Sequence, residues 1–429
     1  MRKSKFFIND YCYNLFVFLL KLLIRSKVFV KYKILLLILF SQISFAQIIP
    51  SFQGFYDKKS SSTSTSNYAL DFDGTSDYII LDGSYLSKPW TAEVWYKRKG
   101  SKNKQYFLWQ SGSSNYWTLR FEQWNNTHKV GITKHQTSDK KWNHTTTIDN
   151  WEHLAFVVSS SNTKTVELFV NGESQGFPGT FTAWPKLYWK YLGRNSSKTI
   201  DGEIDELRIW NDNRTQAEIK ANMFIELEGD EANLVAYYKM SDGSGTTLTD
   251  NASAGNYDGT MTNMTTEDWV TSYAPIATLN SGYKTDIEGL WSESGTSASQ
   301  DSNGLTMAVS STLSEENFAV FGNNGTSGKS TFDLPSSVVV RSARIWQVYK
   351  SGSVSADVII DINAATGNTP TVGDAANYEL LHRIGTSGNF TKVATASVSG
   401  GVSVYEITFS GVIVRKGFYV IAATDSSNL

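Results

Sequence analysis

Three β-rich segments separated by polar turns occupy the middle of the sequence, at residues 151–158, 166–172 and 202–211. Short runs of this kind, divided by turn residues, are typical of an antiparallel β-sandwich. In the second segment Val166, Leu168 and Val170 alternate with Glu167 and Phe169, so one face of that strand can meet a core. Its last two residues, Asn171 and Gly172, supply the positive φ angles of a tight hairpin turn. The sequence therefore predicts an all-β fold in which one sheet packs against another.

Two earlier motifs complete a pattern that resembles a known family. Residues 69–78 (ALDFDGTSDY) and 91–96 (TAEVWY) precede the three segments in the order seen in laminin-G-like, concanavalin-A-like jelly rolls. The resemblance runs from about Tyr68 to about Asn263. It implies a jelly-roll sandwich that binds a ligand outside the cell, but it does not name that ligand.

The first 46 residues read as a targeting segment. Lys31 and Lys33 precede an apolar run at 34–40, and small residues at 44–46 suit cleavage before Gln47. The product would be secreted, extracellular or held at the cell surface, with no membrane insertion of the mature chain.

A second apolar run at 13–23 is interrupted by Lys21 and is shorter than the ~20 residues that span a bilayer. Two explanations remain open. Translation starts near Val30 and the preceding residues are an over-long start, or the two runs form a bipartite anchor.

Charge and cysteine content narrow the class of protein further. Without residues 1–46 the chain keeps 31 basic and 40 acidic residues, a net charge of −9, which does not favour nucleic acid as a partner. The only cysteine, Cys12, lies in the removed segment. The mature protein must therefore be stabilised by core packing, with or without a bound metal, instead of disulfides.

The remaining chain divides into three parts. Residues 47–67 form a Ser/Thr-rich linker, residues 68–272 the jelly roll, and residues 273–429 a second β-sandwich with strand-like runs of its own. Eleven of the 13 tryptophans lie at or before Trp269, which sets the two sandwiches apart. The second sandwich resembles an uncharacterised β domain that accompanies laminin-G-like modules in secreted proteins of the Bacteroidota. Its abrupt end suggests a truncated chain.

A capping box marks one helix after the third β-rich segment. Thr215 can accept a backbone hydrogen bond while Glu218 reaches back, so a short helix is expected to run to about Glu226.

The acidic run at 203–206 superficially resembles the catalytic strand of jelly-roll β-glucanases. Retaining glycosidases need two carboxyl groups about 5–5.5 Å apart. In a regular strand Glu206 points away from Glu203 unless the strand bulges between them. This favours a strand without catalytic residues, and a hydrolase stays the alternative.

Closely spaced carboxylates around a glycine at residues 71–77 are the hard oxygen ligands that calcium prefers. In the resembling family a calcium ion often lies near one sheet edge, and the matching candidates are Asp73, Asp77 and Asp205. The alternative is that Asp73 and Asp77 only stabilise a turn.

Aromatic residues between positions 109 and 191 exceed what one sandwich core needs. They are Trp109, Tyr116, Trp117, Trp124, Trp142, Trp184, Tyr188 and Trp189. Aromatic rings can stack on sugar rings while neighbouring polar groups bind hydroxyls. The preferred ligand-binding residues are Trp142 and Trp184, followed by Trp124, Tyr188 and Trp189. Trp142 lies between Lys141 and Asn143, which suggests an exposed ring.

Two functions fit these patterns. The first is a secreted or cell-surface binding or adhesion module that recognises a glycan or a surface protein through loops on a rigid sandwich. The second is a secreted glycoside hydrolase, or an accessory domain of a polysaccharide-degrading enzyme.

Overall fold

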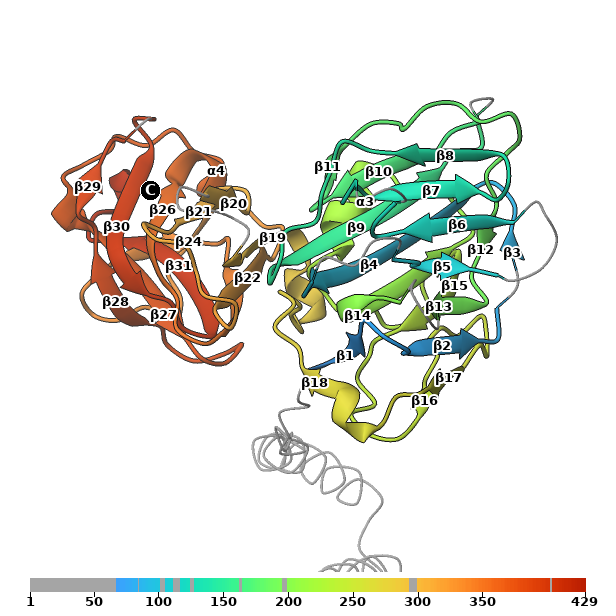
Figure 1. The fold of residues 1–429 in the computed structure, drawn as a ribbon. Helices are drawn as coiled ribbons and strands as arrows, with labels where there is room; N and C mark the ends of the chain where they lie inside the picture. The colour runs from blue at the N-terminus through green and yellow to red at the C-terminus, as the bar shows by residue number, and fades with distance from the viewer. Residues whose placement is uncertain are drawn as a thin grey trace, which may run out of the picture. The chain divides into compact units, whose positions relative to one another are not determined.

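The computed structural model describes residues 67–83, 85–100, 105–110, 116–123, 127–161, 164–194, 199–292, 299–401 and 403–429. The expected targeting segment and nearly all of the linker lie outside these residues. The described chain is almost entirely β, and its strands form two sandwiches that share no sheet (Figure 1). The expected all-β fold, a jelly roll followed by a second sandwich, is confirmed.

The larger sheet of the first sandwich contains the three segments that dominate the sequence. Its strands are, in spatial order, β11 (Glu173–Ser174), β10 (Glu167–Val170), β9 (Trp151–Val158), β4 (Trp90–Arg98), β14 (Asp201–Trp210), β1 (Tyr68–Asp73) and β18 (Trp269–Thr271), with β15 (Leu234–Tyr238) beside β14. Asn171 and Gly172 join β10 to β11 with φ angles of 50° and 75°, as the sequence predicts.

The opposite sheet is assembled from shorter strands. Its order is β16 (Thr247–Leu248), β17 (Gly259–Thr262), β2 (Tyr78–Leu81), β13 (Tyr191–Gly193) and β5 (Leu108–Trp109). A three-stranded sheet continues it, with β6 (Trp117–Arg120), β7 (Gly131–Lys134) and β8 (Ser138–Lys141). The join is made by the Phe107 amide, which donates to the Leu119 carbonyl at 2.9 Å. Strands β3 (Tyr85–Leu86) and β12 (Leu187–Tyr188) pair with each other.

Alternation along the strands builds the core between these sheets. Val94 of β4, Ile204 of β14 and Ile79 of β2 are fully buried in one apolar cluster, which also takes in Leu108 and Leu192. Burying each large apolar side chain stabilises the fold by about 1.5–3 kcal/mol. The residues next to these in sequence therefore lie on the outer faces of the sheets.

Helix α3 (Gln216–Asn222) packs on the outer face of the larger sheet. Thr215 caps it and Glu218 closes the capping box, as predicted, but the helix ends at Asn222 instead of about Glu226. The chain leaves the helix there to form a β-bridge between Ile225 and Ala277. Ile219 of α3 is buried against the sheet. Within the described part of the chain, every helix is too short to cross a membrane.

The second sandwich has two sheets and its own core. One sheet is β19 (Thr285–Leu290), β22 (Phe318–Asn323), β25 (Trp346–Ser351), β31 (Gly417–Ala423), β24 (Val340–Ser342) and β23 (Lys329–Ser330), with β27 (Tyr378–Arg383) and β28 (Thr391–Thr395) added beside β31. The other is β20 (Ser299–Asp301), β21 (Leu305–Ala308), β26 (Ser355–Asp361), β30 (Glu406–Ile413) and β29 (Val398–Ser399), and α4 (Ile362–Thr366) follows β26. Trp346, Ile360 and Ile421 are fully buried between them.

An apolar cluster joins the two sandwiches, and residues 66–429 form one compact unit. Trp291 packs edge-to-face on Trp95 of β4, with ring centroids 5.8 Å apart, and its indole N–H donates to the Trp151 carbonyl at 2.9 Å. Lys97 of β4 bonds both Glu203 and Glu315, the latter from the second sandwich. The outer face of the larger sheet is thus covered by α3 and by the second sandwich.

Candidate functional site

The outer face of the smaller sheet carries a row of aromatic side chains. Tyr191 of β13 lies opposite Ile80 of β2 on one side and Trp109 of β5 on the other. Their sequence neighbours Leu192 and Leu108 point into the core. Because side chains alternate along a strand, Tyr191 and Trp109 project outward together.

Ring contacts link these side chains to one another and to three further tyrosines. Trp109 and Tyr191 stack with centroids 5.0 Å apart and planes 27° apart. Tyr78 lies 6.4 Å from Tyr191, while Tyr106 and Tyr116 lie 5.6 and 6.2 Å from Trp109. We call these five residues the aromatic face. Tyr78, Tyr116 and Tyr191 are half-buried, so their rings are in part accessible to a ligand.

Two arginines lie against the aromatic face. The Arg194 guanidinium is 4.4 Å from the Trp109 ring centroid, and that of Arg120 is 4.0 Å from the Tyr106 ring. Arg194 therefore covers much of Trp109, which is only 6% exposed. The Trp109 indole N–H donates to the Gly193 carbonyl at 2.8 Å, which fixes the ring as a support for Tyr191.

A cavity of about 330 Å³ adjoins the aromatic face, and its lining comes from β6, β7, β8 and the turn between β7 and β8. Arg120 lies in its wall and donates through Nε to the Thr133 hydroxyl, which donates in turn to Asp139 at 2.7 Å. His135 also lines the cavity and stacks on Tyr116 at 4.4 Å. Ligand sites of this size commonly combine apolar walls with a few fixed polar groups.

Trp142, one of the two preferred ligand-binding residues, is buried in the structure. Trp142 is 2% exposed, packs edge-to-face on Phe156 at 5.7 Å and donates its indole N–H to the Gly176 carbonyl at 2.9 Å. The expectation of an exposed Trp142 ring is therefore wrong. Polar sequence neighbours indicate where the flanking side chains point, whereas burial here comes from residues distant in sequence.

The other preferred aromatic residues are dispersed. Trp184 is half-buried under Lys88, whose Nζ lies 3.2 Å from the ring centroid. Tyr188 contacts Tyr85 on the β3–β12 pair at 5.7 Å. Trp189 is 2% exposed in the core, and Trp124 lies outside the described residues. Trp184, Tyr188 and Trp189 do not join the aromatic face.

The residues of the aromatic face were missed as a set by sequence reasoning. Trp109 and Tyr116 were among the surplus aromatics, but Tyr191 and Arg194 were not selected. The sequence signal that could have identified Tyr191 is its place next to Leu192 in a strand, because a core leucine puts the neighbouring tyrosine on the outer face. Which strands lie beside β13 is set by long-range pairing, so alternation alone could not bring Trp109 and Tyr191 together.

The three carboxylates expected to bind calcium do not converge. Asp73 Oδ1 accepts from the backbone N–H groups of Thr75 and Ser76 at 2.6 and 2.9 Å. Asp77 Oδ2 accepts from the Asp73 amide at 2.9 Å, and burial raises the pKa of Asp77 to about 6. These contacts describe a turn that satisfies its own polar groups.

Asp205 lies away from that turn. Asp73 pairs with Asp201 across β1 and β14, and Asp205 is four residues further along β14, or ~13 Å at ~3.3 Å per residue. Its Oδ2 accepts from the Ser272 hydroxyl at 2.6 Å. No group of three His, Cys, Asp or Glu in the described chain is placed to hold a metal. The expected calcium set does not fit this geometry.

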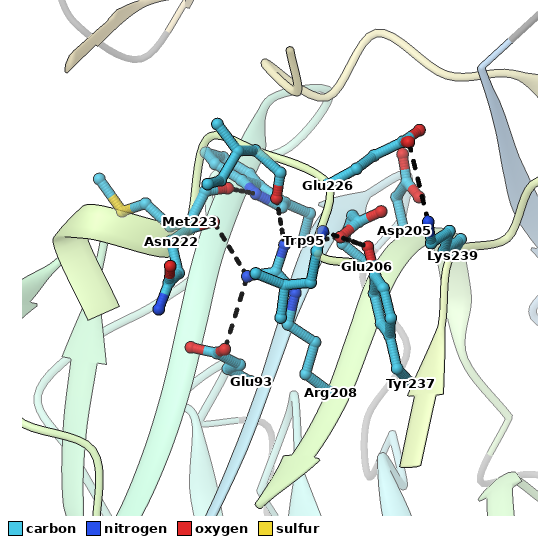
Figure 2. Close-up of polar contacts among 12 residues, drawn as sticks. Glu93, Trp95, Asp205, Glu206, Arg208, Asn222, Met223, Glu226, Tyr237 and Lys239 are labelled. Atoms are coloured by element: carbon cyan, nitrogen blue, oxygen red, sulfur yellow. Dashed lines mark hydrogen bonds and ion pairs between the residues drawn. The ribbon is translucent and has the colours of Figure 1, made fainter. Parts of the chain in front are cut away.

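Glu206, from the acidic run on β14, lies in a buried ionic cluster with Arg208 (Figure 2). Between Asp205 and Arg208 the strand bulges, and Glu206 takes a φ of 54°. Arg208 donates through Nη2 to Glu206 at 2.6 Å and to the Ile225 carbonyl at 2.6 Å. Its Nη1 donates to the Asn222 carbonyl at 3.0 Å. Arg208 thus ties the end of α3 to the sheet.

Neighbouring groups complete this cluster. Tyr237 donates its hydroxyl to Glu206 at 2.6 Å, and Glu93 lies 3.6 Å from Arg208 and accepts from the Trp210 indole at 3.0 Å. All these side chains are buried. Burial raises the pKa of Glu206 to about 7 and also raises that of Glu93, while Arg208 opposes both shifts.

The bulge does not create a catalytic pair. Glu203 forms ion pairs with Lys97 at 2.9 Å and Lys99 at 3.0 Å, whereas Glu206 is bound to Arg208 and Tyr237. Both glutamates are nearly fully buried, at 4% and 1% exposure. Both carboxylates bind other side chains of the fold, and they do so on separate partners.

Residues 73–220 match a family model described as the concanavalin A-like lectin/glucanases superfamily, with the name Laminin_G_3. This confirms the resemblance of the first sandwich. No curated protein matches the chain.

Several solved structures resemble part of the chain. A candidate carbohydrate-binding protein from Bacteroides ovatus is 19% identical with a TM-score of 0.38, over 49% of this chain and 61% of that one. The chain therefore spans less than two thirds of that protein. A heptameric SAP-like pentraxin from Limulus polyphemus is 12% identical with a TM-score of 0.30, over 37% and 82% of the two chains. Domain 4 of the extracellular GH43 arabinanase AbnA from Geobacillus stearothermophilus, solved with arabinotriose, is 21% identical with a TM-score of 0.29, over 35% and 74%.

Proposed function

We propose that the concanavalin A-like sandwich binds carbohydrate through the aromatic face and the cavity beside it. The observation that carries this proposal is the stacked pair of Trp109 and Tyr191, with centroids 5.0 Å apart, on the outer face of the smaller sheet. The outer face of the larger sheet is covered by α3 and the second sandwich. The smaller sheet therefore offers the surface on which a ligand can lie.

The chemistry of this surface suits a sugar. The rings of Tyr78, Tyr116 and Tyr191 can stack on the C–H-rich faces of sugar rings, as aromatic side chains do on flat ligands. Thr133 and Asp139 in the cavity can hydrogen-bond to sugar hydroxyls. Stacking groups and polar groups lie on adjacent strands, so an oligosaccharide chain could contact both.

The proposed activity is binding without hydrolysis. Glu203 and Glu206 of β14 are buried in ion pairs on the other sheet, away from the aromatic face. The proposal does not include calcium, because Asp73, Asp77 and Asp205 do not converge on one site.

Replacing Tyr191 with alanine tests the aromatic face. We expect this change to weaken binding of a glycan identified on an array by about 1–3 kcal/mol, the effect of losing one stacking ring. Binding is measured by calorimetry with the whole chain, and the melting temperature is measured alongside. A half-buried ring at the surface contributes less to stability than a core ring, so we expect only a small decrease in melting temperature.

Two control variants sharpen this experiment. Tyr191→Phe keeps the ring and should retain most of the affinity. Tyr85→Ala removes a tyrosine that is 49% exposed on the β3–β12 pair, outside the aromatic face, and should leave affinity unchanged. Equal losses in Tyr191→Ala and Tyr85→Ala, or unaltered binding in Tyr191→Ala, would contradict the proposal.

We also propose that the protein acts outside the cell, at the surface or after secretion, and that it is exported by the segment ending at Ala46. The basis is the order of basic, apolar and small residues before Gln47. Mass spectrometry of the protein from its producing cell should identify an N-terminal peptide that starts at Gln47. Peptides from residues 1–30 in the exported protein would argue against this processing.

A further inference from the structure

A second cavity, of about 440 Å³, lies at one end of the second sandwich. Strands β27 and β31 pair antiparallel with Arg383 opposite Phe418, so the loop after β27 and the turn before β31 meet at the same end. Gly417 permits this approach, since a Cβ there would lie 2.3 Å from the Arg383 carbonyl oxygen. Residues that line the cavity include His382, Arg383, Asn389, Thr391, Arg415 and Lys416.

The cavity concentrates positive charge in an acidic domain. Residues 273–429 contain nine basic and 13 acidic residues, a net charge of −4, yet Arg383, Arg415 and Lys416 all line this one cavity. No carboxylate is among the described residues that line it. The nearby Asp333 is shared, at 3.1 Å from Arg383 and 3.8 Å from Arg341, so it offsets only part of the charge.

Arg383 is held in place as a binding group would be. Its Nη1 donates to Asp333 and to the Gly388 carbonyl at 3.0 Å, and its guanidinium lies 4.3 Å from the Phe390 ring centroid. The residue is 8% exposed. Its buried Nε has no hydrogen-bond acceptor in the described chain. The contacts with Asp333, Gly388 and Phe390 hold this guanidinium in one position in the cavity wall.

Neutral polar groups complete the lining. Ser387, Asn389 and Thr391 bring hydroxyl and amide groups beside the arginines. An acidic sugar combines an anionic group with hydroxyls, and this lining can satisfy both kinds of group. We propose that the cavity binds a carboxylate or sulfate group of an acidic polysaccharide. The site is separate from the aromatic face, and the proposal does not depend on the function suggested for that face.

The test is calorimetry of the whole chain with polygalacturonate, dextran sulfate and neutral dextran. We expect binding to at least one of the two anionic polymers, with affinity that decreases as salt concentration rises. The two polymers distinguish carboxylate from sulfate recognition. The double variant Arg415→Gln/Lys416→Gln should bind about tenfold more weakly, because it removes two charged donors. His382 donates to the Lys416 carbonyl, and the Tyr419 hydroxyl bonds the Arg415 N–H and the Arg415 carbonyl. Because Arg415 and Lys416 use only main-chain atoms in these hydrogen bonds, the double variant keeps them.

A matched control removes two positive charges elsewhere in the same domain. Lys329→Gln/Lys350→Gln changes the net charge equally at residues that do not line the cavity, and it should bind like the parent. Equal weakening in both double variants would show attraction to net charge and would overturn the site, as would failure of both anionic polymers to bind. The Tyr191→Ala variant should bind these polymers through this cavity as the parent does, which keeps this test apart from that of the aromatic face.

Discussion

Replacing Trp142 with alanine is expected to lower the free energy of unfolding by about 3–5 kcal/mol, the usual cost of removing a large core aromatic residue. The ring is 2% exposed in the main core of the first sandwich. Its loss would leave a cavity against Phe156 and remove the donor to the Gly176 carbonyl. Urea unfolding followed by fluorescence or circular dichroism measures this change.

Trp184 provides the matched control, because the sequence predicts it, like Trp142, as a preferred ligand-binding residue. It is half-buried and its main partner is the Lys88 ammonium group above its ring. A cation–π contact at such a site contributes about 0.5–1 kcal/mol, so Trp184→Ala should destabilise the protein far less. Similar losses in the two variants would contradict the burial of Trp142.

Trp142 also shows where reading the sequence stops being informative. Strand β8, just before it, alternates between half-buried and exposed residues, and Asn143 after it is exposed. Nothing local distinguishes the tryptophan from its surroundings. Its partners Phe156 and Gly176 lie 14 and 34 residues away, on segments whose proximity depends on the whole sandwich.

The fold itself was accessible because its signals are local. The Asn171–Gly172 turn and the capping box at Thr215 each depend on a few consecutive residues, and both form as expected. Strand alternation likewise identifies Leu168 and Val170 of β10 as core positions, and Phe169 between them is buried on the other face, beside Ile219 of α3. The aromatic face depends instead on the register of β2, β13 and β5, which no single segment encodes.

The bulge in β14 is an intermediate case. Sequence reasoning identified the condition that Glu206 changes face only if the strand bulges, but it could not decide whether it does. The bulge forms where Arg208 donates to Glu206, to the carbonyl of Asn222 at the end of α3 and to the carbonyl of Ile225. A positive φ at a glutamate is uncommon, and these contacts stabilise it. The feature that suggested catalysis therefore anchors the helix.

Replacing Arg208 with alanine is accordingly expected to cost about 3–5 kcal/mol of stability at pH 8, because Glu93 and Glu206 would stay buried without their cation. The main-chain acceptors at Asn222 and Ile225 would also lose their donor. Urea unfolding of the whole chain measures the loss. Arg214→Ala removes a less buried arginine that pairs with Asp212 and Glu218 and lies over the Trp210 ring, and it should cost less than Arg208→Ala.

The pH dependence separates this electrostatic loss from simple loss of packing. Glu206 has a pKa of about 7 when folded and an ordinary value near 4.5. Between those values the folded chain keeps a proton that the unfolded chain has released, so this group's contribution to stability decreases as pH rises and levels off above pH 7. Without Arg208 the pKa of Glu206 would rise further, which extends that decrease to higher pH. The destabilisation by Arg208→Ala should therefore be larger at pH 8 than at pH 5, where Glu206 is neutral in the parent protein as well. An equal loss at both pH values would mean that Arg208 acts through packing and main-chain hydrogen bonds alone.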